Sequence, residues 1–496
     1  MYLSKTKYCR LWQCDKMFWL DANHPELQAA DPSVEEKMVT GNEVGDLAMG
    51  LFGDFTEVTV LKEDGRPDIS AMLEKTADCV AAGIENICEA SFSYDGLYCA
   101  VDILHKEPGG YAIYEVKSSA HEAEIYGVDI AYQKYVLEHC GITVTGTYLV
   151  CVDSDYVRGE ELDITQLFRT VDMSGWVAAE YPLLPSRLKT AEETLALREE
   201  PVCDLGEHCT YPYACAYWQY CSRSLPTPSV FDLYRMSTKK KFEYYRMGMT
   251  SYEDMLSAPK LNEKQLRQIR FQLSDCGTHI DKKGIGEFLN TLSYPLYFLD
   301  FETVQPVIPP YPGTSPYQQI PFQYSLHYIE TPGGELKHKE FLAESGVDPR
   351  RDIAESLCRD IPMNVCVTAY NKGFECGRLK ELAAQFPDLA EHLLNIQENV
   401  RDLLVPFQSG YYYNRAMGGS FSIKSVLPAL FPDDPSLDYH NLEGVHNGGE
   451  AMTVFPKIKD MPPEEQAVVR RQLLEYCKLD TYAMVKVWEA LLEAVR

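Results

Sequence analysis

Residues 297 to 304 read YFLDFETV, an apolar run that carries two carboxylates, Asp300 and Glu302. Side chains two positions apart lie on the same face of a strand, so this run predicts a strand with both acids on one face. Two unpaired carboxylates in a protein core would be costly. They need a cationic partner, and a divalent metal ion is one that two carboxylates can share. The run therefore predicts a metal site on one face of a buried strand.

The bulk composition sets broader limits. A chain of 496 residues is long enough for several domains. It contains no apolar run long enough to span a membrane, and its first residues lack the apolar core of a secretory signal. We therefore expect a cytoplasmic protein. In that setting, 16 cysteines favour free thiols or metal ligands over disulfides.

The formal net charge of −28 is unusual for a protein that binds nucleic acid, which normally presents a basic surface. The charge indicates an acidic, self-repelling protein, and it lowers the expectation of tight nucleic-acid binding without a metal ion or a partner. The sequence contains neither a G-x-x-x-x-G-K-[ST] loop nor an H-E-x-x-H motif, which argues against a Walker-type motor and a zinc protease.

The chain is predicted to have three segments. Residues 1–225 have the strand and helix patterns of an α/β unit, and the stretch RSLPTPSV at 223–230 is the linker candidate. Residues 226–292 predict a helical connector, with a helix-hairpin-helix element as an alternative reading. Residues 293–496 predict a second α/β unit that ends in a long helix.

A first group of polar residues lies in the stretch AVDILHKEPGGYAIYEVKSS. The turn KEPGG predicts a hairpin, with Asp102 on one strand beside Glu115 and Lys117 on the next. Two carboxylates can hold Mg²⁺, and a lysine can orient a metal-bound water or balance phosphate charge. This combination suits phosphodiester hydrolysis.

Together with the helices GNEVGDLA and AYQKYVLE on either side, this stretch resembles the PD-(D/E)XK nuclease superfamily, in particular its RecB-like branch. The resemblance implies a restriction-endonuclease-like α/β/α fold, metal binding by Asp102 and Glu115, and catalytic roles for Lys117 and Gln133. Many members have a metal-binding histidine where this chain has Gly45. Glu43 is the alternative ligand.

A second group consists of cysteines. Cys209, Cys215 and Cys221 follow one another at six-residue steps, Cys203 precedes them, and Cys14 stands near the N-terminus. Thiolates suit iron–sulfur clusters or zinc. The pattern resembles that of iron–sulfur RecB-like nucleases, which implies a 4Fe-4S cluster held by Cys14, Cys209, Cys215 and Cys221. Zinc remains an alternative, as do Cys203 in place of one ligand, His208 as a zinc ligand, and plain buried thiols.

A third group extends from Asp300 and Glu302 to the C-terminus. Glu375 enters a predicted helix in the stretch NKGFE, and Tyr476 and Asp480 lie four residues apart, on one face of the last helix. Acids in this order can hold two metal ions that clamp the attacking and leaving oxygens of a phosphodiester. Asp402 is an alternative acid, or else a helix cap.

This third series resembles the DEDD exonucleases of the ribonuclease-H-like fold, in the subclass that uses a tyrosine. The resemblance implies that Asp300, Glu302, Glu375 and Asp480 bind metal and that Tyr476 positions the attacking water. Family members usually have aspartate where this chain has Glu375. The stretch GGSFSIKSVLPAL, with Lys424, is either a phosphate-binding loop or an ordinary helix start. YFLDFET and GSFSIKSVLP also have close counterparts in a bacterial family of uncharacterised domains.

We therefore predict an Mg²⁺- or Mn²⁺-dependent nuclease with a 3′–5′ exonuclease site in the C-terminal segment and a second nuclease site in the N-terminal segment. The expected substrate is nucleic acid, with DNA favoured over RNA, and a helicase or a defence-system protein is the expected partner. The alternative is a nucleic-acid-binding or scaffold protein of a repair or phage-defence complex, in which one or both sites are inactive.

Overall fold

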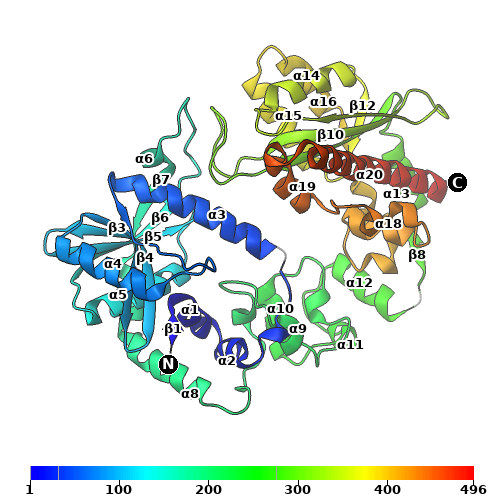
Figure 1. Cartoon of the computed structure of the whole chain (residues 1–496). Coiled ribbons are helices and arrows are strands. Elements are labelled where there is room, and N and C mark those ends of the chain that lie inside the picture. The colour runs from blue at the N-terminus through cyan, green and yellow to red at the C-terminus, as the bar shows by residue number, and fades with distance from the viewer. Residues whose placement is uncertain (1, 32, 275) are drawn as a thin grey trace. The chain divides into compact units, whose positions relative to one another are not determined.

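The computed structural model describes residues 2–31, 33–274 and 276–496, and divides the chain into two compact units (Figure 1). The first unit comprises the residues up to Leu225 together with Pro306–Tyr317, and the second comprises Pro226–Gln305 and Gln318–Arg496. Both units combine helices with a β-sheet, so the protein belongs to the α/β class. Residues 226–292, predicted as a connector, are part of the second unit.

The first unit is built on a seven-stranded sheet with the order β2-β3-β4-β5-β6-β7, in which β1 also pairs with β4. Strands β3, β4 and β5 form an antiparallel meander, and β6 runs parallel to β5 after a helical crossover. The strands are β1 (Leu3–Ser4), β2 (Thr56–Glu57), β3 (Asn86–Tyr94), β4 (Leu97–Glu107), β5 (Gly110–Lys117), β6 (Val144–Val152) and β7 (Phe168–Asp172).

Helices cover both faces of this sheet. Alternate residues of β5 point to opposite faces, so Ile113 enters one apolar core while Ala112 and Tyr114 enter the other. The helices of this unit are α1 (Lys5–Gln13), α2 (Asp15–Asn23), α3 (Ser33–Ala48), α4 (Ile69–Ala82), α5 (Glu124–His139), α6 (Ile164–Leu167), α7 (Ser174–Glu180), α8 (Leu184–Leu195) and α9 (Trp218–Cys221). The predicted hairpin is present as β4 and β5.

Residues 306–317 follow strand β9 (Leu296–Val304) of the second unit in sequence, yet they pack with the first unit. The backbone N–H of Arg158 donates to the carbonyl of Thr314 at 3.0 Å, and its Nη1 donates to the carbonyl of Pro309 at 2.9 Å. The segment is rich in proline, which cannot donate to a strand ladder, so the chain leaves the sheet here.

The second unit has a five-stranded sheet with the order β11-β10-β9-β12-β13. The central strand β9 is antiparallel to β10 on one side and parallel to β12 on the other. The strands are β9 (Leu296–Val304), β10 (Ile320–Ile329), β11 (Lys337–Leu342), β12 (Cys366–Ala369) and β13 (Val400–Asp402), with β8 (Thr278–Ile280) and β14 (Tyr412–Asn414) forming a separate pair.

The long C-terminal helix α20 (Pro463–Val495) packs on one face of this sheet, against β9 and β10 (Figure 1). Three helices, α14 (Arg350–Asp360), α15 (Gly373–Gln385) and α16 (Ala390–Glu398), share an apolar core with the other face. The remaining helices are α10 (Thr238–Arg246), α11 (Tyr252–Met255), α12 (Glu263–Leu273), α13 (Lys282–Leu289), α17 (Val405–Gln408), α18 (Ile423–Leu430) and α19 (Gly448–Val454).

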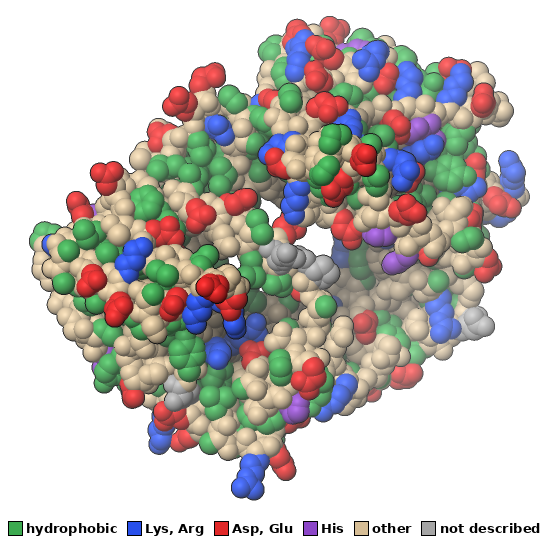
Figure 2. Space-filling model, viewed as in Figure 1, with side chains coloured by type: hydrophobic (Ala, Val, Ile, Leu, Met, Phe, Trp, Pro, Cys, Tyr) green, Lys and Arg blue, Asp and Glu red, His purple; other side chains and the backbone are tan. Residues whose placement is uncertain are grey.

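None of the helices in the described part of the chain is both long enough and apolar enough to cross a bilayer. On the face that Figure 2 shows, acidic side chains are widely spread and interspersed with basic ones. All sixteen cysteines are free thiols.

Candidate functional site

The alternation of β9 explains why this buried strand carries two acids. Leu299 and Phe301 point into the core formed with α14, α15 and α16. Asp300 and Glu302 therefore point to the opposite face, which α20 covers. Glu302 is buried, and the described residues that could hold a metal ion include a group formed by Asp300, Glu302 and Cys477 of α20.

Helix α20 brings the other predicted residues to the same place. Tyr476 and Asp480 are both buried and are one turn apart on the face that contacts β9. The hydroxyl of Tyr439 donates to Oδ1 of Asp480 at 2.7 Å, and the hydroxyl of Tyr476 also hydrogen-bonds that carboxyl group. The sequence did not single out Tyr439, because the loop that carries it has no recognisable pattern.

Like charges crowd this site, which we call the β9 site. Burial, followed by the charges of Asp480 and Glu302, raises the pKa of Asp300 well above its usual value, and burial raises the pKa of Asp480 to about 6. Lys424 of α18 opposes these shifts. Its Nζ lies 5.4 Å from the ring centre of Tyr439 and 5.9 Å from that of Tyr476. The site thus holds more negative charge than its lysine balances.

Glu375, in the first turn of α15, is buried, and its Oε2 has no hydrogen-bond partner in the described structure. Burial raises its pKa to about 8, and its charge acts on Asp300 and Glu302. The alternative acid, Asp402, instead caps the turn before α15. Its carboxylate accepts the backbone N–H groups of Asn371 at 2.9 Å and Lys372 at 3.3 Å.

Glycine lines the β9 site where α19 begins. A Cβ atom placed on Gly448 would lie 3.2 Å from Oε2 of Glu302 and 4.0 Å from the hydroxyl of Tyr476. A neighbouring cleft of about 1090 Å³ is lined by Lys424, Tyr439, His446, Asn447 and Glu450, among others, and not by the acids of the site themselves. The site therefore has room beside it for a ligand.

The first unit also gathers its predicted residues, into a cluster that we call the β4–β5 site. Glu115 is fully buried, and Asp102 lies on the neighbouring strand. The paired register of β4 and β5 ends at Ile103 and Tyr114, and Oδ2 of Asp102 then accepts the backbone N–H of Val116 at 2.7 Å. Burial and the charge of Glu115 raise the pKa of Asp102 to about 6.

Helix α5 completes the β4–β5 site. Lys117 donates to Oε1 of Glu115 and, at 3.2 Å, to Oδ2 of Asp129. Nε2 of Gln133 donates to Glu115 at 2.7 Å and to Asp129 at 3.0 Å, whereas its Oε1 is buried without a partner in the described structure. Asp129 was not predicted, although its position one helical turn before Gln133 is a usable signal.

Two further residues of this site were also missed. Lys5, at the start of α1, contacts Glu115 and Asp102. Glu89 of β3 has a φ of 58°, a left-handed conformation that is rare for non-glycine residues. Burial and the charge of Asp102 raise its pKa to about 7. Glu43, the predicted substitute for the missing histidine, is exposed on α3.

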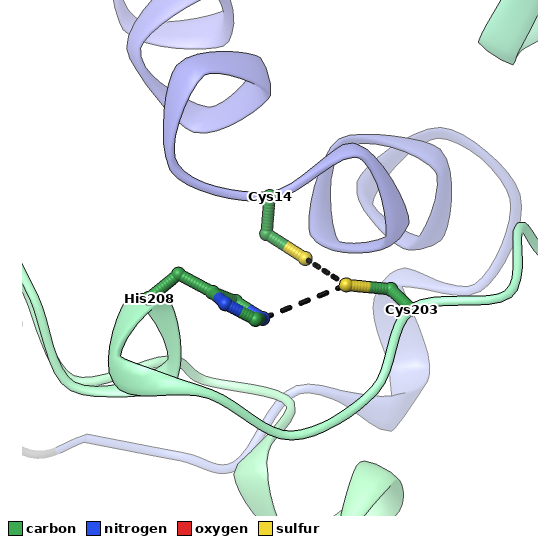
Figure 3. Close-up of side chains that lie close together, drawn as sticks. All are labelled: Cys14, Cys203 and His208. Carbon is green, nitrogen blue, oxygen red and sulfur yellow. Dashed lines mark hydrogen bonds between the residues drawn. The ribbon is translucent and has the colours of Figure 1, made fainter.

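The cysteines meet at one small cavity. Its volume is about 20 Å³, and its lining includes Cys14, Cys203, His208, Cys209, Cys215 and Cys221. Figure 3 shows Cys14, from the junction of α1 and α2, and His208 both directed toward the sulfur atom of Cys203. The two sulfur atoms are 3.7 Å apart, and Nε2 of His208 is 3.5 Å from Sγ of Cys203.

The ionisable groups of this cysteine cavity shift one another's pKa values. The hydrogen bond with Cys203 lowers the pKa of Cys14, which favours its thiolate form. Contacts with Cys14 and Cys209 raise the pKa of His208 to about 10. The predicted ligands Cys209, Cys215 and Cys221 line the same cavity, as do the alternative ligands Cys203 and His208.

The comparisons with known proteins concern the second unit. Residues 297–422 match a family described as a domain of unknown function, DUF2779. This match includes β9, Glu375 and the loop before α18, but not Tyr476 or Asp480. No curated protein matches the chain significantly.

Proposed function

We propose that the protein is a metal-dependent nuclease whose main active site is the β9 site, acting as a 3′–5′ exonuclease of the DEDD type with a catalytic tyrosine. One observation carries the proposal. Carboxylates from separate parts of the second unit, on β9, α15 and α20, converge beside Tyr476 and have raised pKa values. A sheet whose central strand has antiparallel neighbours on one side and parallel ones on the other supports a ribonuclease-H-like fold.

The β9 site suits divalent ions. Glu375 has a buried oxygen without a partner in the described structure, and the backbone at Gly448, which has no side chain, lies close to Glu302. We propose that Asp300, Glu302, Glu375 and Asp480 hold Mg²⁺ or Mn²⁺. When bound, such ions supply charge stabilisation at the attacking and leaving oxygens of the phosphodiester.

The other side chains have separate roles in this proposal. Burial and the neighbouring acids raise the pKa of Tyr476, so its hydroxyl stays protonated and can orient a water molecule for attack. The hydroxyl of Tyr439 holds Asp480 in place. The ammonium group of Lys424 can balance the charge of a phosphate in the adjoining cleft.

We further propose that the first unit is a RecB-like PD-(D/E)XK domain with a restriction-endonuclease-like fold. In this proposal Asp102 and Glu115 bind metal, while Lys117 and Gln133 position the reacting groups. The thiolate and imidazole donors around the cysteine cavity suit iron or zinc. Cys14, Cys209, Cys215 and Cys221 would hold a 4Fe-4S cluster, with Cys203 and His208 as alternative ligands and zinc as the alternative metal.

The test is cleavage of end-labelled single- and double-stranded DNA and RNA with Mg²⁺ or Mn²⁺, using protein purified without oxygen. The native chain is compared with Asp300→Ala/Asp480→Ala, with Lys117→Ala and with Glu391→Ala, an exposed acid on α16 of the second unit that serves as the control. We expect stepwise loss of nucleotides from the 3′ end that is abolished only by the double substitution.

If Lys117→Ala is the only variant that loses cleavage, the main active site lies in the first unit. If the native chain with its thiol centre intact cleaves none of the substrates, the nuclease proposal is wrong and a binding or scaffold role takes its place.

A further inference from the structure

Lys5 is part of the β4–β5 site although it lies near the N-terminus, whereas the residues predicted for this site lie between Asp102 and Gln133. Helix α1 begins at Lys5, directly after its N-cap Ser4. The ammonium group lies 3.0 Å from Oε1 and 3.2 Å from Oε2 of Glu115, and 3.6 Å from Oδ1 of Asp102. Lys5 thus bridges the two carboxylates that are proposed to share a metal ion.

The donors around Glu115 occupy both of its oxygens. Oε1 accepts from Lys5 and Lys117, and Oε2 accepts from Lys5 and Gln133. These lysines outweigh the effect of burial and hold the pKa of Glu115 well below its usual range. Because an ion between Glu115 and Asp102 would need the same oxygens that face Lys5, the ammonium group and the ion compete for one place.

The charges in the site support the same conclusion. Two lysines, Lys5 and Lys117, contact three carboxylates, those of Asp102, Glu115 and Asp129, which leaves one formal negative charge. Glu89 is a further acid of the site. A divalent ion in the place of Lys5 avoids the repulsion between two adjacent cations that the same ion beside Lys5 would cause.

We propose that Lys5 is a built-in counter-ion that must leave the β4–β5 site before a divalent metal ion can bind there. This inference rests on the proposed function, in that Asp102 and Glu115 are taken as metal ligands. Lys5 acts as a positioning residue, which keeps the two carboxylates paired while no metal is bound.

The side chain of Lys5 can leave without moving its helix. Leu3 of β1 pairs with Leu97 of β4, and Cys14, directly after α1, lines the cysteine cavity, so both ends of α1 are held. The Lys5 side chain is 23% exposed and therefore has a path to solvent. A change of rotamer would be enough, and we expect Lys5 to weaken metal binding rather than to prevent it.

The test measures Mn²⁺ affinity by electron paramagnetic resonance and calorimetry, independently of cleavage. All variants carry Asp300→Ala/Asp480→Ala, which removes two of the four carboxylates that are proposed to hold metal in the second unit. Into this background we introduce Lys5→Met, Lys5→Gln and, as the charge-retaining control, Lys5→Arg. Two further chains carry Glu115→Gln, one alone and one together with Lys5→Met. Circular dichroism and thermal melting check the fold of each.

We expect Lys5→Met and Lys5→Gln to bind Mn²⁺ at least 10-fold more tightly than the background, Lys5→Arg to bind like the background, and Glu115→Gln to abolish the gain. Equal Mn²⁺ affinity with and without the charge of Lys5, through Glu115 in both cases, would overturn the role of Lys5 while leaving the metal site intact. If neither neutral Lys5 variant binds Mn²⁺, the metal-binding role of Asp102 and Glu115 is wrong as well.

Discussion

Two tyrosines contact the same carboxyl group in the β9 site, yet we expect them to differ in function. We predict that Tyr476→Phe lowers the cleavage rate by about 10²-fold, the effect typical of a group that handles a proton in the reaction, and leaves Mn²⁺ affinity unchanged. The measurement is single-turnover cleavage of a 3′-end substrate, together with Mn²⁺ titration.

Tyr439→Phe is the matched comparison. It removes the 2.7 Å hydrogen bond to Asp480 and should lower the free energy of unfolding by about 1–3 kcal/mol, because a buried carboxyl group loses a donor. An equal loss of cleavage rate in both variants would contradict a special role for Tyr476.

The acids of the β9 site also predict a pH dependence. The pKa of Asp480 is about 6 and that of Glu375 about 8, so at low pH these groups carry protons that a metal ion must displace. We therefore expect Mn²⁺ affinity to rise as the pH increases from about 6 to about 8. Calorimetry in buffers of different ionisation enthalpy would show the protons released.

The stability of the metal-free chain should change in the opposite direction. Carboxyl groups with raised pKa values keep protons in the folded chain that the unfolded chain has already lost, so stability falls as the pH rises from about 4 to about 8. The measurement is urea unfolding of the metal-free chain across this pH range. A rise in the free energy of unfolding with pH would contradict the raised pKa values.

At the scale of elements, the start of α19 limits the space beside β9. We predict that Gly448→Ala lowers the cleavage rate about 10-fold and weakens Mn²⁺ binding, because its Cβ would lie 3.2 Å from Oε2 of Glu302 and displace that carboxylate. Steady-state kinetics with Mn²⁺ titration would measure both effects.

The control for this change is Gly377→Ala, inside α15, where an added Cβ has no atom within 4 Å. This substitution should leave cleavage unchanged and stabilise the helix by about 0.5–1 kcal/mol. Unchanged cleavage in Gly448→Ala would show that the space beside Glu302 is not used.

For the whole molecule, the division into two units predicts separate unfolding events. All the residues around the cysteine cavity belong to the first unit. We expect Cys14→Ser, or removal of the metal by a chelator, to lower the midpoint of one transition in calorimetry and to leave the other within about 2 °C, since metal binding stabilises only the unit that contains the site. Exonuclease activity should persist.

Exposed thiols elsewhere provide the comparison. Cys276 lies in the second unit and is distant in sequence from every predicted ligand of the cysteine cavity. Cys276→Ser should therefore shift neither unfolding midpoint. If Cys14→Ser shifts neither midpoint, the cavity is a packing feature and not a metal centre.

The sequence alone determined features that depend on local periodicity. The alternation of YFLDFETV placed Asp300 and Glu302 on one face of β9, and four-residue spacing placed Tyr476 and Asp480 on one face of α20. The turn KEPGG predicted the hairpin of β4 and β5. These features need only the geometry of a strand, a helix or a turn.

Tertiary structure alone decided which distant residues meet. Lys5 and Glu115 are 110 positions apart, and Tyr439 and Asp480 are 41 apart, so no local period connects them. The packing of α1 onto the first sheet and of the loop before α19 onto α20 brings them together. Packing also gave the two acids near α15 different surroundings. Glu375 is buried with an unpaired oxygen, whereas Asp402 accepts backbone N–H groups as a cap. Long-range contacts of this kind depend on which apolar faces of helices and sheets are buried against one another. Local sequence patterns do not specify that pairing.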